Sequence, residues 1–335
     1  MNATEGQRIK AICAADGRAE VASVPRPFAG PGAVLVRPTL ALLTPFEREV
    51  ARGLGRARDG ARVLGHAFVG VVEALGPGVE GPLAPSARVV VHPVFSCGRC
   101  PRCSAGLPLH CAERAIAGLD AAAGGLAELV AVPASACAAL PAALDDERAV
   151  FAAPLARAIE AVRRGGVDRR TYASVLGDDL LAILATIVAL EENPLARLVA
   201  THEATLRAAE QFGIRHRARA ETGLRGDQQL VIDTTGSADS IAAAARMAEP
   251  RGHVVVAGIS ARAPVAVDLS GIALDEIEIH GSGFGPLGGA VNRLASRAVD
   301  PSPLVARRVG LADAARAVAT LGEPGVFSVL VQVTR

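Results

Sequence analysis

The sequence has little that would direct it to a nucleic acid or a membrane. Its 35 basic and 34 acidic residues give a formal net charge of +1, so there is no basic surplus for nucleic acid. No apolar run reaches the roughly 18 residues that span a bilayer, and the polar segment 1–10 lacks the apolar core of a secretory signal. We therefore expect a cytoplasmic protein that binds neither nucleic acid nor membrane and whose partner is a small molecule.

Cysteine is also scarce, and six cysteines in 335 residues do not make a disulfide scaffold. Four of them nevertheless share one short segment, at the spacing Cys-x2-Cys-x2-Cys-x7-Cys: Cys97, Cys100, Cys103 and Cys111. Four thiolates complete a tetrahedral Zn²⁺ shell, and a shell without an open position is structural. The alternatives are chance clustering of free cysteines or an iron–sulfur site with a different spacing. We predict one structural zinc per chain.

The chain divides into two regions with different hydrophobic patterns, as expected for a length that favours two domains. Up to about residue 150, short strand-like runs are separated by Pro and Gly, which is typical of a β domain. From about residue 156, strand-like and helix-like segments alternate, which predicts a parallel, doubly wound sheet. These segments are strands 174–176, 197–199, 230–233, 253–257 and 276–279 and helices 180–190, one ending at 213, and 241–248. A terminal strand, 327–333, could rejoin the first domain.

A series of short motifs in this order resembles the zinc-containing medium-chain dehydrogenase/reductase family, to which the alcohol dehydrogenases belong. Besides the cysteine loop, the motifs are Gly65-His66, Gly70-Val71-Val72, Gly124–Glu128, Ala153–Ala156, Asp233–Gly236 and Gly281–Pro286. The resemblance covers essentially the whole chain. It implies an α/β fold with a GroES-like β domain (1–150 and 282–335), a Rossmann domain (151–281), an active-site cleft between them, and a homodimer or homotetramer.

The resemblance also implies a second, catalytic zinc, whose ligands are mostly replaced here. The family's cysteine ligand corresponds to Thr44, its proton-relaying hydroxyl to Phe46, and its two glutamates to Ala67 and Ala153, so that only His66 remains. One imidazole beside a neutral hydroxyl is a poor site for a divalent metal, because charged ligands supply much of the affinity. We expect no catalytic zinc.

Residues that the resemblance assigns to the nicotinamide cofactor have changed as well. Gly177 opens the phosphate-binding turn, but Asp179 replaces the glycine that lets the pyrophosphate approach the helix N-terminus. Two like charges about 4 Å apart repel by roughly 4 kcal/mol at an effective dielectric constant of about 20, which is about a thousandfold in affinity. Ala200, followed by Thr201, stands where an acidic residue would hold the ribose of NAD. Asp233 ends a strand and either faces the cofactor or caps its turn.

Arg157 corresponds to a position beside the nicotinamide ring, where a small residue is normal. Together with Asp179 it leads us to expect impaired NAD(P) binding. The alternatives are that Asp179 caps its own helix, that Arg157 forms a structural ion pair, and that the alignment is shifted by one residue.

Glu47 corresponds to the family's aspartate that supports the zinc-bound histidine. Our hypothesis is that a Glu47–His66 pair fixes the imidazole tautomer for general acid/base work, with Arg157 clamping an anionic group of the substrate. The predicted function is non-redox chemistry, such as isomerisation, elimination or cyclisation, on a small organic molecule in the interdomain cleft. The alternatives are a zinc-independent NADP(H)-dependent reductase and a non-catalytic binding or assembly protein, in which Glu47 merely satisfies a buried His66.

Overall fold

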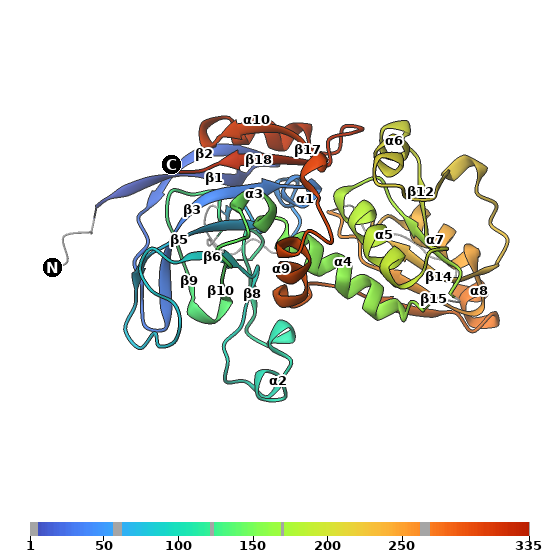
Figure 1. Ribbon diagram of the computed structural model, residues 1–335, viewed down its shortest axis with the longest axis horizontal. Coiled ribbons are helices and arrows are strands. Elements are labelled where there is room, and N and C mark those ends of the chain that lie inside the picture. The colour runs from blue at the N-terminus through green and yellow to red at the C-terminus, as the bar shows by residue number, and fades with distance from the viewer. Residues whose placement is uncertain (1–5, 56–61, 121–123, 169–170, 262–268, 335) are drawn as a thin grey trace. The chain divides into compact units, whose positions relative to one another are not determined.

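A computed structural model describes residues 6–55, 62–120, 124–168, 171–261 and 269–334, so the first half of the polar segment 1–10 lies outside the described residues. The chain forms two compact units. The first unit consists of Met1–Ala153, Pro286–Leu321 and Ser328–Arg335, and the second of Pro154–Gly285 and Gly322–Phe327. In Figure 1 the first unit is coloured blue to green and red, and the second green to orange.

The first unit is built mainly of short antiparallel strands. Its largest sheet has the order β10-β6-β5-β3-β18-β17, with β9 also paired to β3, and a smaller sheet has the order β2-β1-β4. The strands are β1 (Arg8–Ala15), β2 (Arg18–Pro25), β3 (Ala33–Leu43), β4 (Arg62–Val63), β5 (Phe68–Leu75), β6 (Arg88–Val91), β7 (Val94–Phe95), β8 (Ala115–Ile116), β9 (Val130–Pro133), β10 (Cys137–Ala139), β17 (Val305–Gly310) and β18 (Ser328–Gln332).

The first unit also contains helices of three to ten residues. They are α1 (Pro45–Ala51), α2 (Pro101–Ser104), η1 (Pro108–His110), η2 (Ala134–Ala136), α3 (Asp146–Ala149), α9 (Leu287–Ala295), η4 (Ser302–Leu304) and α10 (Leu311–Thr320). The terminal strand β18 runs antiparallel to β3, with Val331 opposite Ala41. As the sequence suggested, the last part of the chain therefore returns to the sheet that the first part began.

The second unit is a single parallel sheet with the order β13-β12-β11-β14-β15-β16. This order reverses direction between β11 and β14, which is the Rossmann arrangement and leaves a switch point at the carboxyl ends of those strands. The strands are β11 (Ala173–Leu176), β12 (Arg197–Ala200), β13 (His216–Ala218), β14 (Gln228–Asp233), β15 (Ala248–Val256) and β16 (Glu278–Gly281). The predicted fold, a GroES-like domain with a Rossmann-like parallel-sheet domain, is confirmed.

Helices alternate with these strands: α4 (Ala152–Gly165), α5 (Leu180–Glu192), α6 (Glu203–Gln211), η3 (Arg219–Glu221), α7 (Ala238–Met247) and α8 (Leu269–Leu274). Helix α5 is apolar on all sides and is almost completely buried, as its run of Leu, Ile, Val and Ala requires. Helix α7 packs against β14 and β15, and its Met247 joins Val231 and Val254 in a core cluster.

Several element boundaries differ from the sequence-based expectation: β15 begins five residues before 253, and α7 begins three residues before 241. Helix α6 ends at Gln211, two residues before Gly213. Strand β16 begins at Glu278 and not at Glu276, because Glu276 has a φ of 52°, which a β-strand does not allow. β16 is the edge strand of the sheet. The expected homodimer or homotetramer stays a prediction.

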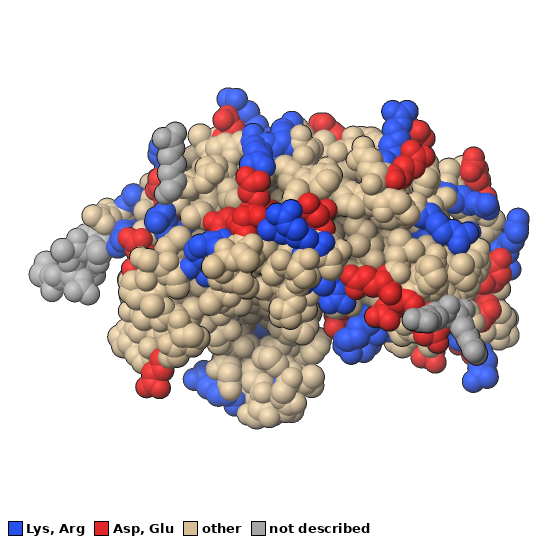
Figure 2. All heavy atoms as spheres, viewed as in Figure 1, with Lys and Arg blue, Asp and Glu red and all other residues tan. Residues whose placement is uncertain are grey.

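The surface and the helices agree with the absence of strong electrostatic or membrane signals. On the face drawn in Figure 2, basic and acidic side chains are interspersed, with no broad area of one sign. Of the helices in the part of the chain that the structure describes, none combines the length and apolar character needed to cross a bilayer.

Candidate functional site

The four clustered cysteines lie on one loop that carries α2 and η1 and stands away from the sheets of its own unit (Figure 1). The Sγ atom of Cys111 lies 3.5 Å from that of Cys97, and Cys100 Sγ lies 3.6 Å from Cys103 Sγ and 3.8 Å from Cys111 Sγ. A tetrahedral zinc with bonds of about 2.3 Å to sulfur separates its ligands by about 3.8 Å. The loop therefore fits a structural zinc with no position left for substrate.

Glu47 and His66 are brought together by the start of α1. Thr44 is the N-cap of this helix: its hydroxyl accepts a hydrogen bond from the Phe46 amide, and Glu47, at the third helical position, accepts one from the Thr44 amide. This capping box fixes the Glu47 side chain. Its second oxygen, Oε1, lies 2.5 Å from Nδ1 of His66 and accepts a hydrogen bond from the His66 amide.

The Glu47–His66 pair is inaccessible to solvent, since each side chain is 1% exposed. Burial alone would raise the pKa of Glu47, but the charge and hydrogen bond of His66 and the amides of Thr44 and His66 outweigh it, so the pKa lies below its ordinary value. The ring of Phe46 packs on the imidazole at a centroid distance of 4.5 Å. The arrangement holds His66 with a defined nitrogen toward a carboxylate, next to an apolar face.

Groups of three or more possible metal ligands occur at two places among the described residues. One is the cysteine loop, and the other comprises His253, Glu278 and His280. Neither group contains His66. Thr44, which occupies the family's cysteine position, directs its hydroxyl to the helix cap and to Glu47 Oε2, at 3.1 Å.

The turn after β11 contains Gly177, where a side chain cannot be accommodated, because an added Cβ would lie 2.0 Å from the Thr234 hydroxyl. Asp179 follows as the N-cap of α5. Its Oδ1 atom accepts hydrogen bonds from the Ala182 amide and from the Thr234 hydroxyl, each at 2.9 Å. This geometry matches one of the alternatives given for Asp179, namely that it caps its own helix.

Burial and the neighbouring groups of the second unit determine the charge of the Asp179 carboxylate. Burial raises its pKa to about 6, while the Ala182 amide, the Thr234 hydroxyl and the nearby Arg157 guanidinium act in the opposite direction. Arg157 is itself buried, donates a hydrogen bond to the carbonyl of Ala257 at 2.9 Å and lies 5.4 Å from the centroid of the Phe284 ring. Arg157 therefore partly neutralises the carboxylate that stands in the phosphate-binding turn.

Asp178, which the sequence interpretation did not single out, connects this turn to the next strand. Its carboxylate accepts hydrogen bonds from the amides of Thr201, at 3.0 Å, and His202, at 2.8 Å. These amides follow Ala200, at the end of β12, where an acidic side chain was expected and is missing. A carboxylate therefore does lie at the end of β12, but it belongs to Asp178, in the turn that follows β11. The sequence signal that could have indicated this is the aspartate next to Asp179 in a turn where glycines are expected.

Asp233 caps a turn. Its carboxylate accepts hydrogen bonds from the hydroxyl of Thr235 and the amide of Gly236, both at 2.8 Å. Asp233 was expected either to face the cofactor or to cap its turn, and the geometry matches the second interpretation.

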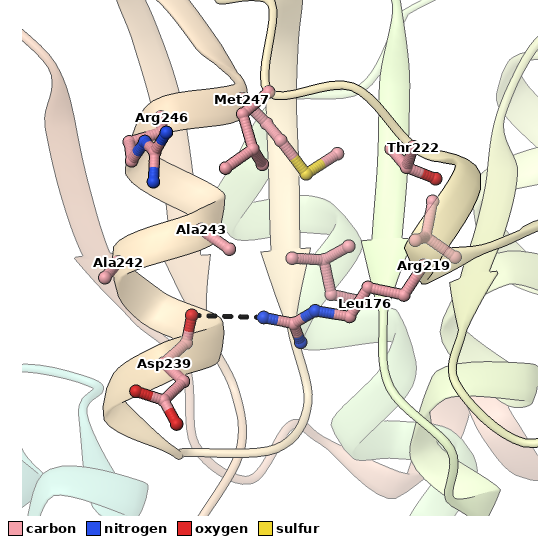
Figure 3. A pocket seen from close by; sticks show the side chains of 10 residues that line it. Leu176, Arg219, Thr222, Asp239, Ala242, Ala243, Arg246 and Met247 are labelled. Atoms are coloured by element: carbon pink, nitrogen blue, oxygen red, sulfur yellow. Dashed lines mark hydrogen bonds between the residues drawn. The ribbon is translucent and has the colours of Figure 1, made fainter.

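A hollow of about 380 Å³ is lined by helix α7 and by the segment 219–224, and Leu176 of β11 and Val199 of β12 form part of its wall (Figure 3). Leu176, Val199 and Met247 contribute apolar surface to it, and Arg219 and Arg246 contribute charge. Figure 3 shows the Arg219 guanidinium extending to the backbone oxygen of Asp239, to which it donates a hydrogen bond of 3.1 Å. A volume of this size accommodates a small organic group.

Comparisons with known proteins agree with this architecture. Residues 30–142 match the alcohol dehydrogenase GroES-like domain. The chain is 28% identical over 284 residues to the 2-dehydro-3-deoxy-L-galactonate 5-dehydrogenase of Pseudoalteromonas atlantica, which covers 81% of this chain and 82% of that protein.

Two solved structures superpose on nearly the whole chain. A zinc-binding-dehydrogenase-like protein of Sinorhizobium meliloti 1021 bound to NADP has a TM-score of 0.86 and 26% identity, covering 98% of this chain and all of that one. The short chain alcohol dehydrogenase (rspB) of Escherichia coli CFT073, complexed with NADH, has a TM-score of 0.85 and 25% identity, with coverage of 98% and 100%. In sequence and in fold, the chain is thus similar to the zinc-type alcohol dehydrogenases of the medium-chain dehydrogenase/reductase family.

Proposed function

We propose that this protein is a nicotinamide-dependent oxidoreductase that acts on a small hydroxylated or carbonyl compound without a metal ion at the substrate. The observation that carries the proposal is the order of the parallel sheet, which reverses direction between β11 and β14, because sheets of this type bind nucleotides at that switch point. Similarity to dehydrogenases, including structures bound to NADP and NADH, supports redox chemistry more than the non-redox chemistry that the sequence led us to expect.

The hollow suits the adenosine end of a dinucleotide. Leu224, which is 40% exposed, offers an apolar contact to a base, and Arg219 is held in place by Asp239 and by the hydroxyl of Ser240. When bound, the nicotinamide would supply or accept a hydride.

The turn after β11 repels the pyrophosphate of a dinucleotide less strongly than its sequence suggests. The Asp179 carboxylate is engaged by an amide and a hydroxyl of its own unit, and Arg157 opposes its charge. The repulsion of a pyrophosphate is therefore smaller than that of an isolated carboxylate at the same place.

The end of β12 favours NAD(H) over NADP(H) in this proposal. The Asp178 carboxylate, anchored to the amides of Thr201 and His202, offers acceptors to ribose hydroxyls and repels a 2′-phosphate. This preference differs from the NADP(H)-dependent alternative inferred from Ala200.

His66 is the acid/base residue of the proposal. Because Nδ1 faces Glu47, Nε2 is the nitrogen that would exchange a proton with the substrate oxygen. The His66 side chain is only 1% exposed, so the substrate has to displace the groups that cover it. Glu47 stabilises the charged imidazolium and keeps the ring oriented. Replacing His66 by Ala is then expected to reduce turnover by about 10²–10⁴-fold, the range typical of a positioned acid/base group.

Non-redox acid/base chemistry is the second candidate. One observation favours it: a carboxylate, that of Asp179, occupies the turn where family members carry glycine. Nothing in the described residues favours a non-catalytic role over these two functions.

Titration of the protein with NADH and NADPH, followed by nucleotide fluorescence, distinguishes the candidates. We expect NADH to bind at micromolar concentration and at least about tenfold more tightly than NADPH. Absence of NADH binding up to millimolar concentration would exclude the first candidate and leave the second. The Asp179→Asn variant tests the effect of the carboxylate charge, because it keeps the helix cap and removes the charge. This variant is expected to bind NADH more tightly than the wild type.

A further inference from the structure

Three possible metal ligands meet on the last two strands of the parallel sheet. His253 of β15 lies opposite Glu278 of β16 in the strand register. His280 follows two residues after Glu278 and therefore points to the same face of the sheet. Residues that lie about 25 positions apart in the sequence are thus neighbours because the strands run in parallel, and none of the three belongs to the site described above.

The separations of the ligand atoms match a metal shell. His253 Nδ1 lies 3.2 Å from His280 Nε2, and Glu278 Oε2 lies 3.4 Å from His280 Nε2 and 3.8 Å from His253 Nδ1. A tetrahedral Zn²⁺ with bonds of about 2.0–2.1 Å to nitrogen and oxygen requires separations of about 3.3–3.4 Å between its ligands. A shift of a few tenths of an ångström in the Glu278 side chain completes the match.

The cluster is open to ions from solvent. The side chains of His253, Glu278 and His280 are 40%, 61% and 25% exposed, so a metal can enter without unfolding of the sheet. The two histidines also line a surface hollow of about 600 Å³. Of the three arginines that line this hollow, Arg163 is paired with Glu160 and Arg251 with Glu276, which lowers the positive charge that an entering cation meets.

We propose that His253, Glu278 and His280 form a second divalent-metal site, which binds Zn²⁺ through two imidazole nitrogens and one carboxylate oxygen. Two imidazoles select zinc and its neighbours in the first transition series over Mg²⁺ and Ca²⁺, which prefer all-oxygen ligands. Three protein ligands leave the fourth position to water or to an anion, for which the arginine-lined hollow is suited. With fewer charged ligands than the four thiolates of the cysteine loop, this site fills after the loop.

Isothermal titration of tag-free protein, brought to one zinc per chain by dialysis against a weak chelator, tests the site. We expect one further equivalent of Zn²⁺ to bind. His253→Ala and His280→Ala are each expected to weaken this second equivalent by at least about 100-fold, since even outer-shell changes cost 10–100-fold. An anomalous scattering peak at the zinc edge beside the three side chains in a zinc-soaked crystal would locate the ion directly.

Matched controls exist within the same unit. His216, which is half-buried and 3.5 Å from Glu210 but has no third ligand, is replaced by Ala in the first control. Glu203→Gln, a change at an exposed glutamate of α6 that is paired with Arg207, is compared with Glu278→Gln in the second. The proposal is overturned if the protein takes up no zinc beyond the loop, or if the His253→Ala/His280→Ala double variant, with an unchanged melting temperature, takes it up with wild-type affinity.

Discussion

One carboxylate holds both the first turn of helix α1 and the imidazole of His66. Glu47 accepts the Thr44 amide with one oxygen and lies 2.5 Å from His66 Nδ1 with the other. The ring of His66 also packs against Phe46, so a carboxylate and an aromatic ring together fix its position.

The Glu47→Gln variant should be destabilised by about 1–3 kcal/mol, because a neutral amide cannot accept all the buried hydrogen bonds that the carboxylate accepts from the Thr44 and His66 amides. Urea denaturation at neutral pH measures the loss. The folded-state pKa of Glu47 is lowered from 4.5, so its stabilisation is present above pH 4.5 and disappears as pH falls through the folded value. The difference between wild type and variant should therefore narrow only below about pH 4.5. As control, Glu73→Gln, which breaks a surface pair with Arg37, should cost less than about 1 kcal/mol.

The Asp179→Asn variant should be more stable than the wild type at neutral pH, by about 1–3 kcal/mol at about 1.4 kcal/mol per pKa unit. Burial raises the pKa of Asp179 from 3.8 to about 6, so the native protein binds a proton more tightly than the unfolded chain. Wild-type stability from this group is greatest below pH 3.8 and is lost as pH rises through 6. Thermal unfolding should show the advantage of the variant growing between pH 4 and 6.5.

Asp145 provides the opposite case for comparison. It is also a helix N-cap, but its hydrogen bonds to Arg148 outweigh partial burial and lower its pKa. Asp145→Asn should therefore reduce stability at neutral pH. An equal response of the two variants to pH would contradict the assigned electrostatics.

Asp178→Asn should shift cofactor preference toward NADPH by about tenfold, since it removes a negative charge from the position proposed for the ribose while keeping an acceptor for the Thr201 amide. Parallel titrations with NADH and NADPH give the ratio. Asp227→Asn, a change at an aspartate that contacts Gln228, is a suitable control with no expected change in preference. A ratio that stays the same in Asp178→Asn would remove the assignment of this residue.

Cys100→Ser should release the zinc of the cysteine loop and lower the melting temperature, because the shell loses a thiolate that the other three ligands cannot replace. Zinc per chain after dialysis against a weak chelator, measured by mass spectrometry, is expected to fall from one to near zero. Cys137→Ser, outside the loop, should retain its zinc. Equal zinc contents in the two variants would show that the loop does not bind the metal.

The fold could be predicted because it depends on features repeated many times. Alternating strands and helices fix a parallel sheet, and the cysteine spacing brings four thiolates onto one loop, whatever the details of each residue. The pairing of Glu47 with His66 followed from the family resemblance, which supplied a contact across 19 positions that spacing alone does not indicate.

Single side-chain directions could not be predicted in this way. Asp179 was expected to face a ligand, but the amide of Ala182 and the hydroxyl of Thr234 turn it toward its own helix and turn. The metal cluster on β15 and β16 was missed because its members meet only through the strand register. Only the alternation Glu278-x-His280, two possible ligands on one face of a strand, was visible in the sequence.

The pairing of β18 with β3 has a consequence for the folding of the protein during its synthesis on the ribosome. The second unit is almost continuous in sequence, so its sheet can form while later residues are still being added. Strand β3 has to wait for its neighbour, β18, until residues 328–332 emerge. A nascent chain released early would therefore expose an unpaired β edge in the first unit, which is where chaperones would be needed most.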